Sequence, residues 1–582
     1  MKRIARVLAA VLVLALLAAC SNNAAAPAPA ASTAPAAPAA TKAPDTAAAP
    51  AADTPAAPAG AHADIGLDGV KFTDTRHITV EIFDRNNDGG TTPADNYYTD
   101  FIKQGVLETH NIEVEFIPVP RWTEGDDINN MLAAGTAPDI CVTYSAPTIQ
   151  LYAAMGGVHE LTPYLDETKD VLPNLFEFLG DTGIYWSKDP DTGELYSVEG
   201  KRANVAKQTT FIRNDWLETL GLAVPNSEEE FYNALIAFRD NAATLLPNEP
   251  DKMIPLLMTY DVGWMAAPLI NAYIPDALTD KELYTLGFDD RFLLYPGYKD
   301  AIRKLNQWYN EGLIWKDFAL YGAGDTTNEL LSKAGYVGAQ MQNWDSLYRN
   351  GEDSVITNIR RATGNDKAGY VALNPFPNDS GKVRTFPYAP VGSDRKVFFP
   401  ASNDEVYASL LYLDWISDAT NRQYLQIGDE GVTHSVEPDG GIRTIAVTGE
   451  KIMNSLNNID YTITCNGLSF EDPEVTMKSI ALGYAGVEAE LVIQAYELSQ
   501  VNSRFNNAGT LGTIAAEEGK GTELSSKRDV FLDQAVVATP DKFDSVFDGG
   551  LNDYLASGGQ AIIDERTQVW EKYFGSSINL DK

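Results

Sequence analysis

Short apolar runs alternate with helix-like segments along the first folded part of this chain. The run 77–83 (HITVEIF) has the alternation of a strand, and a helix pattern from Pro93 separates it from a second strand at 112–117. A third strand pattern follows at 140–144. This spacing predicts a parallel α/β sheet, in which ligands bind beyond the carboxyl ends of the strands. The loops after Phe83 and Val142 are therefore the first places to expect a site.

The charge of the chain limits its partners. Lys and Arg number 44 against 81 Asp and Glu, so the formal net charge is −37. Nucleic acids and anionic membrane surfaces both bind through a basic surface, so we exclude them as partners. The five histidines are scattered along the chain, which argues against a histidine-rich metal site.

The N-terminus has the pattern of a bacterial export signal. Basic residues among the first six positions precede an apolar segment, 7–17, that is too short to span a bilayer. The segment ends in LAAC, residues 17–20, which resembles the lipobox of bacterial lipoproteins. The resemblance implies a signal peptide at 1–19 and lipid chains on Cys20, which would hold the protein at the extracellular face of the cell membrane. An ordinary export signal with a chance cysteine is the alternative.

The segment 20–73 is predicted to be a disordered tether. From Ser21 to Ala63, 30 of 43 residues are Ala or Pro. Such a composition buries too little side chain to offset the entropy that is lost on ordering, so the segment stays unfolded or partly extended. If it is largely extended, it reaches on the order of 100 Å from the membrane.

Five segments in order resemble one protein family. They are GTAPDI at 135–140, TFIRNDWLETLGL at 210–222, VPNSEEEFYNAL at 224–235, WYNEGLI at 308–314 and GDEGVTHSVE at 428–437. With them the chain is similar to the family 1 extracellular solute-binding lipoproteins, the ligand receptors of sugar-importing ABC transporters, to which maltose-binding protein is distantly related. The resemblance extends from about residue 76 to the C-terminus. It implies a two-lobe α/β fold of the periplasmic-binding-protein type (type II).

The same resemblance implies that hinge strands cross between the lobes. We expect residues 74–200 and 395–440 in the first lobe. Residues 201–394 and 441–582 are expected in the second lobe, which finishes in a helical C-terminal part. In such a receptor the ligand bridges both lobes, and its binding shifts the population toward the closed form.

A carbohydrate site is implied where two strand patterns end in a tryptophan. The apolar run 336–341 precedes a tryptophan that resembles a sugar-stacking residue of the family, and the run 254–258 precedes another. An indole face packs on the C–H face of a sugar ring, while carboxylates and amides bind its hydroxyl groups. Interlobe packing is the alternative. The second lobe is thus expected to contribute Asp261, Trp264, Asn343, Trp344 and Asp345.

The first lobe is expected to contribute ligand contacts from the loops after its strands, with solvated loops as the alternative. Glu430 in the GDEG segment matches a family hallmark, although a turn or hinge role competes with ligand contact. The loop residues concerned are Asp84, Arg85 and Asn86 after the first strand, and Tyr144 or Ser145 after the third.

No cofactor is expected, with calcium as a weak candidate. Asp189 and Asp191 lie in DPDTGE, which resembles the start of a calcium loop. An EF-hand has Gly at its sixth position and Glu at its twelfth, whereas this segment has Glu and Gly there, so a β-turn explains it better. Cys141 is expected to be a small buried side chain, and a disulfide with Cys465 is the alternative.

We therefore expect a monomeric receptor that passes a sugar, most simply an oligosaccharide, to an ABC transporter permease. It is not expected to be an enzyme, which is what the family resemblance implies, and no G-x-S-x-G, H-E-x-x-H, C-x-x-C or P-loop motif occurs. A glycosidase or lyase stays an alternative because its acids have no short signature. A polysaccharide-binding adhesin is the third class. For a receptor, Trp344→Ala is expected to weaken binding by roughly 1–3 kcal/mol without unfolding the protein.

Overall fold

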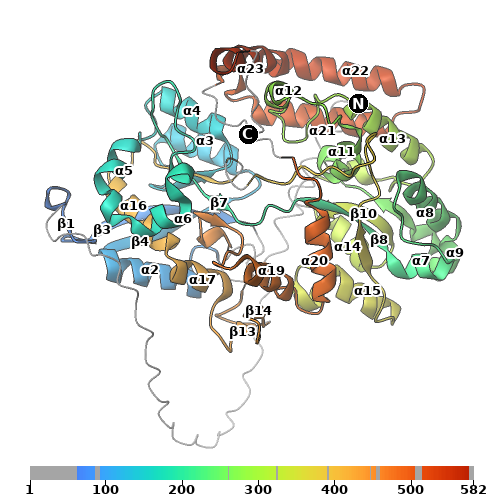
Figure 1. Ribbon diagram of the computed structural model, residues 1–582, viewed down its shortest axis with the longest axis horizontal. Helices are drawn as coiled ribbons and strands as arrows, with labels where there is room; N and C mark the ends of the chain where they lie inside the picture. Colours follow the sequence, from blue (N-terminus) through green and yellow to red (C-terminus); the bar gives the residue numbers. More distant parts are fainter. Residues whose placement is uncertain are drawn as a thin grey trace, which may run out of the picture. The chain divides into compact units, whose positions relative to one another are not determined.

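The computed structural model describes residues 62–85, 92–259, 261–322, 325–389, 392, 394–445, 447–453, 459–504 and 514–575. Cys20, Asn86 and most of the predicted tether lie outside these residues. The described part has two groups of strands and helices (Figure 1), each with its own hydrophobic core. We call them the first and second lobes, and they confirm the predicted two-lobe α/β class.

The first lobe begins with a small hairpin that lies inside the segment predicted to be a disordered tether, 20–73. Strands β1 (Leu67–Asp68) and β2 (Lys71–Phe72) pair antiparallel. Leu67 and Phe72 are only 2% and 3% exposed and belong to the core of the first lobe. The folded part therefore starts before residue 74, because these two apolar side chains anchor the segment.

A parallel strand pair forms the base of the first lobe. β3 (Arg76–Asp84) and β4 (Ile112–Pro120) pair along their whole length, and α2 (Tyr97–His110) connects them. Asn96 and the third residue of α2 form a reciprocal capping box, which fixes where the helix begins. β5 (Cys141–Thr143) comes next, and Ile140 just before it forms a parallel bridge with Val80 of β3. The three predicted strands are confirmed in their order.

The chain returns to the first lobe near the predicted residue 395. β12 (Lys396–Phe398) joins the sheet between β5 and β6 (Val198–Glu199) and is antiparallel to both. α16 (Val406–Ser417) then packs against α6 (Pro173–Ile184). Its Trp415 is 5% exposed and contributes to the core.

The second lobe is built on a four-stranded mixed sheet with the order β11-β8-β10-β9. β10 (Val337–Asn343) is parallel to β9 (Ile254–Leu257) and antiparallel to β8 (Gln208–Arg213), which in turn pairs antiparallel with β11 (Tyr370–Leu373). Apolar side chains of the surrounding helices fill its core. The strand patterns at 254–258 and 336–341 are both confirmed, as β9 and β10.

The helix α8 (Glu228–Asp240) shows how local sequence fixes a helix start in this lobe. The Ser227 hydroxyl accepts from the N–H of Glu230, which is one half of an S-x-x-E capping box. The Glu230 carboxylate, however, accepts from the N–H of Asn226 instead of that of Ser227. Three glutamates in the first turn suit the positive end of the helix dipole.

The C-terminal helices pack on the second lobe. α21 (Gly521–Val537) contacts α13 (Tyr298–Asn310) and α22 (Phe543–Tyr554), and α23 (Gln560–Tyr573) contacts α12 (Asp280–Leu286). Figure 1 shows these red helices beside the green helices α11 to α13. Trp570 of α23 is 3% exposed, and its ring lies 4.6 Å from that of Phe574, the residue that follows the helix. No helix within the described ranges has both the length and the apolarity to cross a membrane.

A smaller cluster of helices covers one side of the second sheet. α20 (Ala489–Leu498) packs against β11 and against α19 (Pro473–Leu482). Their apolar side chains share a separate core with α15 (Val355–Thr363) and with the residues that follow β10. We call this the α19/α20 cluster.

Three segments lie side by side where the chain passes between the lobes. β7 (Lys201–Arg202) pairs in parallel with β15 (Cys465–Asn466), and the N–H of Tyr388 donates to the carbonyl of Val205 over 3.0 Å. The chain therefore also crosses just before β15, in a part that we expected wholly in the second lobe. Two side chains of this crossing belong to the core of the first lobe, namely Tyr461 and Ile463.

The two cysteines of the folded part are separate buried thiols. Each faces a backbone carbonyl, with Sγ 3.3 Å from the oxygen of Pro138 for Cys141 and of Gly467 for Cys465. Burial raises the pKa of Cys465 to about 11 and that of Cys141 well above its usual value. Cys141 is the small buried side chain that we expected, and the disulfide alternative is wrong.

Candidate functional site

Trp264 lies in α10 (Val262–Met265), a single helical turn that follows β9. Asp261 precedes this turn with a positive φ of 56°, and its carboxylate accepts from the N–H of Trp264 over 3.0 Å. The same carboxylate lies 2.6 Å from Nη2 of Arg291. The Arg291 guanidinium lies over the Trp264 ring, 4.8 Å from its centroid. Asp261 therefore holds the indole and the guanidinium in place.

Two cavities lie beside this turn. They enclose about 380 and 280 Å³ of space between atoms, a measure that includes open solvent. Trp264 lines the smaller cavity together with Arg291 and Phe292. The larger cavity extends along the segment that leads back to the first lobe, with Phe376 and Thr385 in its wall. Four residues line both cavities, namely Lys207, Gln208, Asn271 and Phe386.

Two amides on the shared wall carry unpaired polar atoms. Nε2 of Gln208 and Oδ1 of Asn271 are buried and have no hydrogen-bond partner in the described part of the chain. A buried donor or acceptor left unpaired costs about 1–3 kcal/mol. An amide donor and an amide acceptor on one wall complement hydroxyl groups, since each hydroxyl both donates and accepts.

Lys207 is the cation on this shared wall. The residue is only 9% exposed, and Nζ lies 5.1, 5.2 and 5.6 Å from the ring centroids of Trp264, Tyr388 and Phe292. Aromatic faces stabilise a nearby ammonium group. Burial nevertheless lowers the pKa of Lys207 to about 8. The site thus combines a desolvated ammonium with three aromatic rings.

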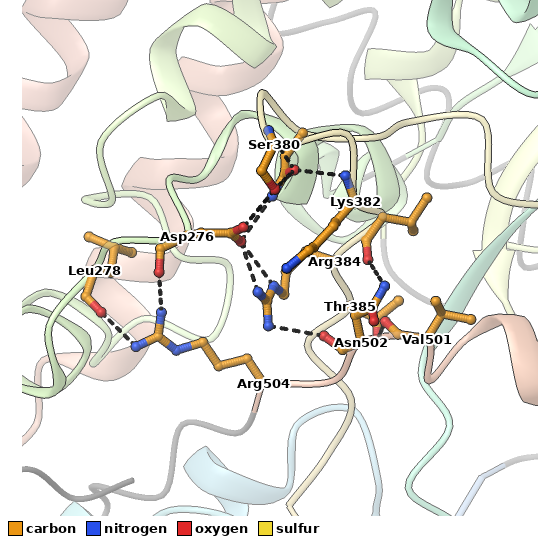
Figure 2. A network of polar contacts seen from close by, with 11 residues as sticks. Asp276, Leu278, Ser380, Lys382, Arg384, Thr385, Val501, Asn502 and Arg504 are labelled. Carbon is orange, nitrogen blue, oxygen red and sulfur yellow. Dashed lines mark hydrogen bonds and ion pairs between the residues drawn. The ribbon is translucent and has the colours of Figure 1, made fainter.

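A polar network holds the segment that lines the larger cavity (Figure 2). The Asp276 carboxylate accepts from Nε and Nη2 of Arg384, over 3.1 and 2.9 Å, and from the hydroxyl of Ser380 over 2.9 Å. On the other side, the hydroxyl of Thr385 donates to the carbonyl of Val501 over 2.9 Å. These bonds tie the segment to the second lobe and so fix the position of the neighbouring Phe386.

Trp344 occupies a different environment from the one expected. It is 3% exposed and lies in the α19/α20 cluster. Its ring packs edge to face against Tyr496 at 5.0 Å and against Tyr484 at 6.0 Å. In this structure the ring is enclosed by residues of the second lobe, which is neither the stacking on a ligand that we expected nor the interlobe packing that was its alternative.

The neighbours of Trp344 are divided between the cluster and the cavity wall. Asp345 accepts from Nε and Nη2 of Arg349, over 2.9 and 2.6 Å, and from the hydroxyl of Tyr484 over 2.9 Å. Its carboxylate is therefore engaged within the protein. Asn343 ends β10 opposite Gln208 in the ladder, so it lies next to the wall of the cavities.

The carboxyl ends of the parallel strands form an aromatic face on the first lobe. Tyr144 follows β5 and stacks on Phe83 of β3, with centroids 6.2 Å apart. Arg121 follows β4, and its guanidinium lies 4.6 Å from the Tyr144 ring and 4.9 Å from the Phe83 ring. The next residue, Trp122, is 64% exposed. An exposed indole beside this stack offers a surface on which a ligand ring can pack.

The other residues expected on the first lobe have partners within the protein. Arg85 binds the Asp460 carboxylate through Nε and Nη2, over 2.5 and 3.0 Å. Ser145 caps α4 (Ala146–Ala154) by accepting from an N–H of its first turn. Asp84 is the last residue of β3, and its carbonyl accepts from the N–H of Arg121. The strand ends thus bring Asp84, Arg85 and Tyr144 together, with Tyr144 in the aromatic face.

The remaining candidates form turns. Glu430 is exposed in a turn that is bridged to His434, in keeping with the turn alternative. The Asp189 carboxylate accepts from two N–H groups of its own turn, each over 2.8 Å, and Asp191 pairs with Lys572 of α23. Within the described ranges no group of three or more side chains is arranged to hold a metal ion.

Sequence patterns did not point to four residues of these surfaces. Trp122 had a usable signal, because it follows the second predicted strand just as the expected loops follow the first and third. Lys207 and Gln208 lie in the hinge segment KRANVAKQTT, where the family resemblance offers no matching position. Asn271 lies in α11 (Ala267–Tyr273), and nothing in its local sequence separates it from a surface amide.

Comparisons with known proteins agree with this architecture. Residues 97–437 match the family described as bacterial extracellular solute-binding protein. The chain is 25% identical over 310 residues to lipoprotein LipO of Bacillus subtilis (strain 168), a match that spans 47% of this chain and 55% of LipO. It is 23% identical over 477 residues to the polygalacturonan/rhamnogalacturonan-binding protein YtcQ of the same organism, covering 79% of this chain and 86% of YtcQ. Among solved structures, alginate-binding protein AlgQ2 has a similar fold, with a TM-score of 0.62, 15% identity and coverage of 86% and 98%.

Proposed function

We propose that this chain, which belongs to the bacterial extracellular solute-binding protein family, captures a carbohydrate between its two lobes and delivers it to the permease of an ABC importer. The relative named for polygalacturonan and rhamnogalacturonan supports a carbohydrate solute. We propose further that lipid chains on Cys20 anchor the protein, as the lipoprotein relative suggests, and that it acts as a monomer without catalysis.

The observation that carries the proposal is the wall shared by the two cavities. It combines aromatic rings with the unpaired amide atoms of Gln208 and Asn271. A sugar has one face of C–H groups and a rim of hydroxyls, so it matches both components of the wall. A purely apolar solute would leave the two amides unpaired.

Capture follows from the presence of an aromatic surface on each lobe. Trp122 and Tyr144 present the surface of the first lobe, while Trp264 and Phe386 line the cavities of the second. A sugar that contacts both surfaces binds the closed form more tightly than the open form, so it shifts the population toward closure. In this proposal the closed form is what the permease recognises.

The test is a thermal-shift and calorimetric panel of mono- and oligosaccharides on the purified protein. A captured sugar should raise the melting temperature progressively as its concentration exceeds the dissociation constant. Asn271→Ala should weaken binding, whereas Gln307→Ala, which removes an exposed amide from α13, should leave it unchanged. The absence of any saccharide that binds with a defined stoichiometry would refute the proposal.

The same material separates the two competing classes. A receptor returns its oligosaccharide unchanged after incubation, which chromatography of the recovered ligand shows directly. A shortened product would indicate a glycosidase or lyase, and binding of polymer without any oligosaccharide would indicate an adhesin.

A further inference from the structure

Among the described residues, one cation on the cavity wall has no ionic partner. Of the three cationic side chains that line the cavities, Arg291 and Arg384 each pair with aspartates of the second lobe. Lys207 forms no ion pair with any carboxylate of the described residues, although it is more than nine-tenths buried. It lines both cavities, so its ammonium group is available to whatever occupies them.

The charges around Lys207 do not replace that partner. The charged groups that face it are Asp261, Asp290, Arg291 and Arg202. Both aspartates are bound by Arg291, and Arg202 pairs with Asp394 over 3.2 Å. Loss of hydration outweighs the attraction of the two carboxylates, because the pKa of Lys207 is lowered instead of raised. A carboxylate brought by a ligand would restore the missing interaction.

We propose that Lys207 binds the carboxylate of an acidic saccharide, so that the captured solute is a uronic-acid oligosaccharide. This rests on the proposed function and specifies its substrate class. A neutral sugar offers Lys207 only hydroxyl oxygens, whereas a carboxylate accepts the stronger charge-assisted hydrogen bond.

The rest of the wall fits the other groups of such a sugar. Gln208 and Asn271 offer their unpaired amide atoms to ring hydroxyls, and Trp264 and Phe292 offer apolar surface to C–H groups. The chain as a whole carries a net charge of −37 and so repels an anion at long range. Selection of an acidic solute therefore requires a cation at the contact itself, and Lys207 provides it.

The decisive experiment compares acidic and neutral forms of the same ligand on the full chain. Calorimetric titrations use oligomers of galacturonate, glucuronate and mannuronate, each with its carboxyl methyl ester. The acid should bind at least about tenfold more tightly than its ester. Lys207→Met should weaken acid binding by about 10- to 100-fold and leave ester binding within about threefold. Lys207→Arg, which keeps the charge, should retain the preference for the acid.

A matched control removes one positive charge elsewhere. Lys527 lies on α21, where it pairs with Asp553 at the surface, so Lys527→Met should leave both affinities unchanged. The affinity of the unmodified protein for the acid should also fall as pH rises above about 8, while its affinity for the ester stays constant. The sign follows because only the ammonium form of Lys207 attracts the carboxylate.

The outcomes distinguish this inference from the proposed function. Esters that bind as tightly as the acids, a Lys207→Met variant that loses both equally, or an acid affinity that does not change with pH would overturn the assignment of Lys207. Binding of neutral oligosaccharides alone would overturn the acidic class and leave the receptor function standing. Failure of every saccharide to bind would refute both.

Discussion

Trp264 and Trp344 follow strands of the same sheet, and the chain around them has the same local pattern. One ring lines a cavity beside Lys207, whereas the other is 3% exposed beneath Tyr484 and Tyr496. The α19/α20 cluster packs over the end of β10 and encloses Trp344, whereas α21 packs against the turn after β9 and leaves Trp264 on the wall of a cavity. A strand that ends in tryptophan marks where the ring leaves the sheet, and later segments decide whether it stays accessible.

Replacing Trp344 should produce the largest effect and should act on stability. Trp344→Ala leaves a cavity in the α19/α20 cluster, so we expect the free energy of unfolding to fall by roughly 3–5 kcal/mol while saccharide affinity is unchanged. Chemical denaturation and calorimetry measure the two quantities. If stability is kept and affinity falls, the stacking role expected from sequence is right and the contrast between the two rings disappears.

Replacing Trp264 should act mainly on binding. Trp264→Ala removes a ring from the cavity wall, and we expect a loss of roughly 1–3 kcal/mol in saccharide affinity. Trp264→Phe keeps an aromatic face and should recover part of that loss. Calorimetric titration of both variants tests this, and an alanine variant with unchanged affinity would remove Trp264 from the site.

Trp122 should show a smaller effect that is confined to binding. Because its side chain is already 64% exposed, Trp122→Ala should change the free energy of unfolding by less than about 0.5 kcal/mol. We expect affinity to fall by about 1 kcal/mol if the first lobe stacks on the sugar. Leu320→Ala, at a residue 77% exposed on the second lobe, is the control and should change neither quantity.

A pH effect on stability is expected in the part of the second lobe that carries Asp261. Burial, with smaller contributions from Asp529 and Asp261, raises the pKa of Asp533 to about 7. Between about pH 4 and 7 the folded state then holds a proton that the unfolded state has lost, so this group lowers stability as pH rises through that window. In the Asp533→Asn variant, the melting temperature should fall less between pH 4 and 7 than it does in the unmodified protein. Parallel profiles for the two proteins would contradict the shifted pKa.

The fold was predictable because its signals are local. Strand alternation at 77–83 and 112–117 and the N-cap at Ser227 depend on residues a few positions apart, and the structure contains all three. The crossing before β15 was missed, since its assignment depends on pairing with β7 more than 260 positions earlier.

The candidate site was predictable only in part, because only some of its residues have a signal in the sequence next to them. Asp261 and Trp264 adjoin their strand, so a local pattern found them. The enclosure of Trp344 depends on two tyrosine rings about 140 and 150 positions away, and no residue near Trp344 in the sequence indicates that they pack on it. Lys207 is distinctive because no carboxylate of the described residues forms an ion pair with it. This can be recognised only when the surrounding side chains have been placed.

The three hydrogen-bonded segments that join the lobes have a mechanical consequence. A single strand would let one half swivel about the other, whereas strips bonded edge to edge resist torsion, since twisting shears the bonds between them. Flexing across their width leaves those bonds intact. We therefore expect the two lobes to close by rotation about a single axis. A sugar that enters in any orientation then meets the same closing motion.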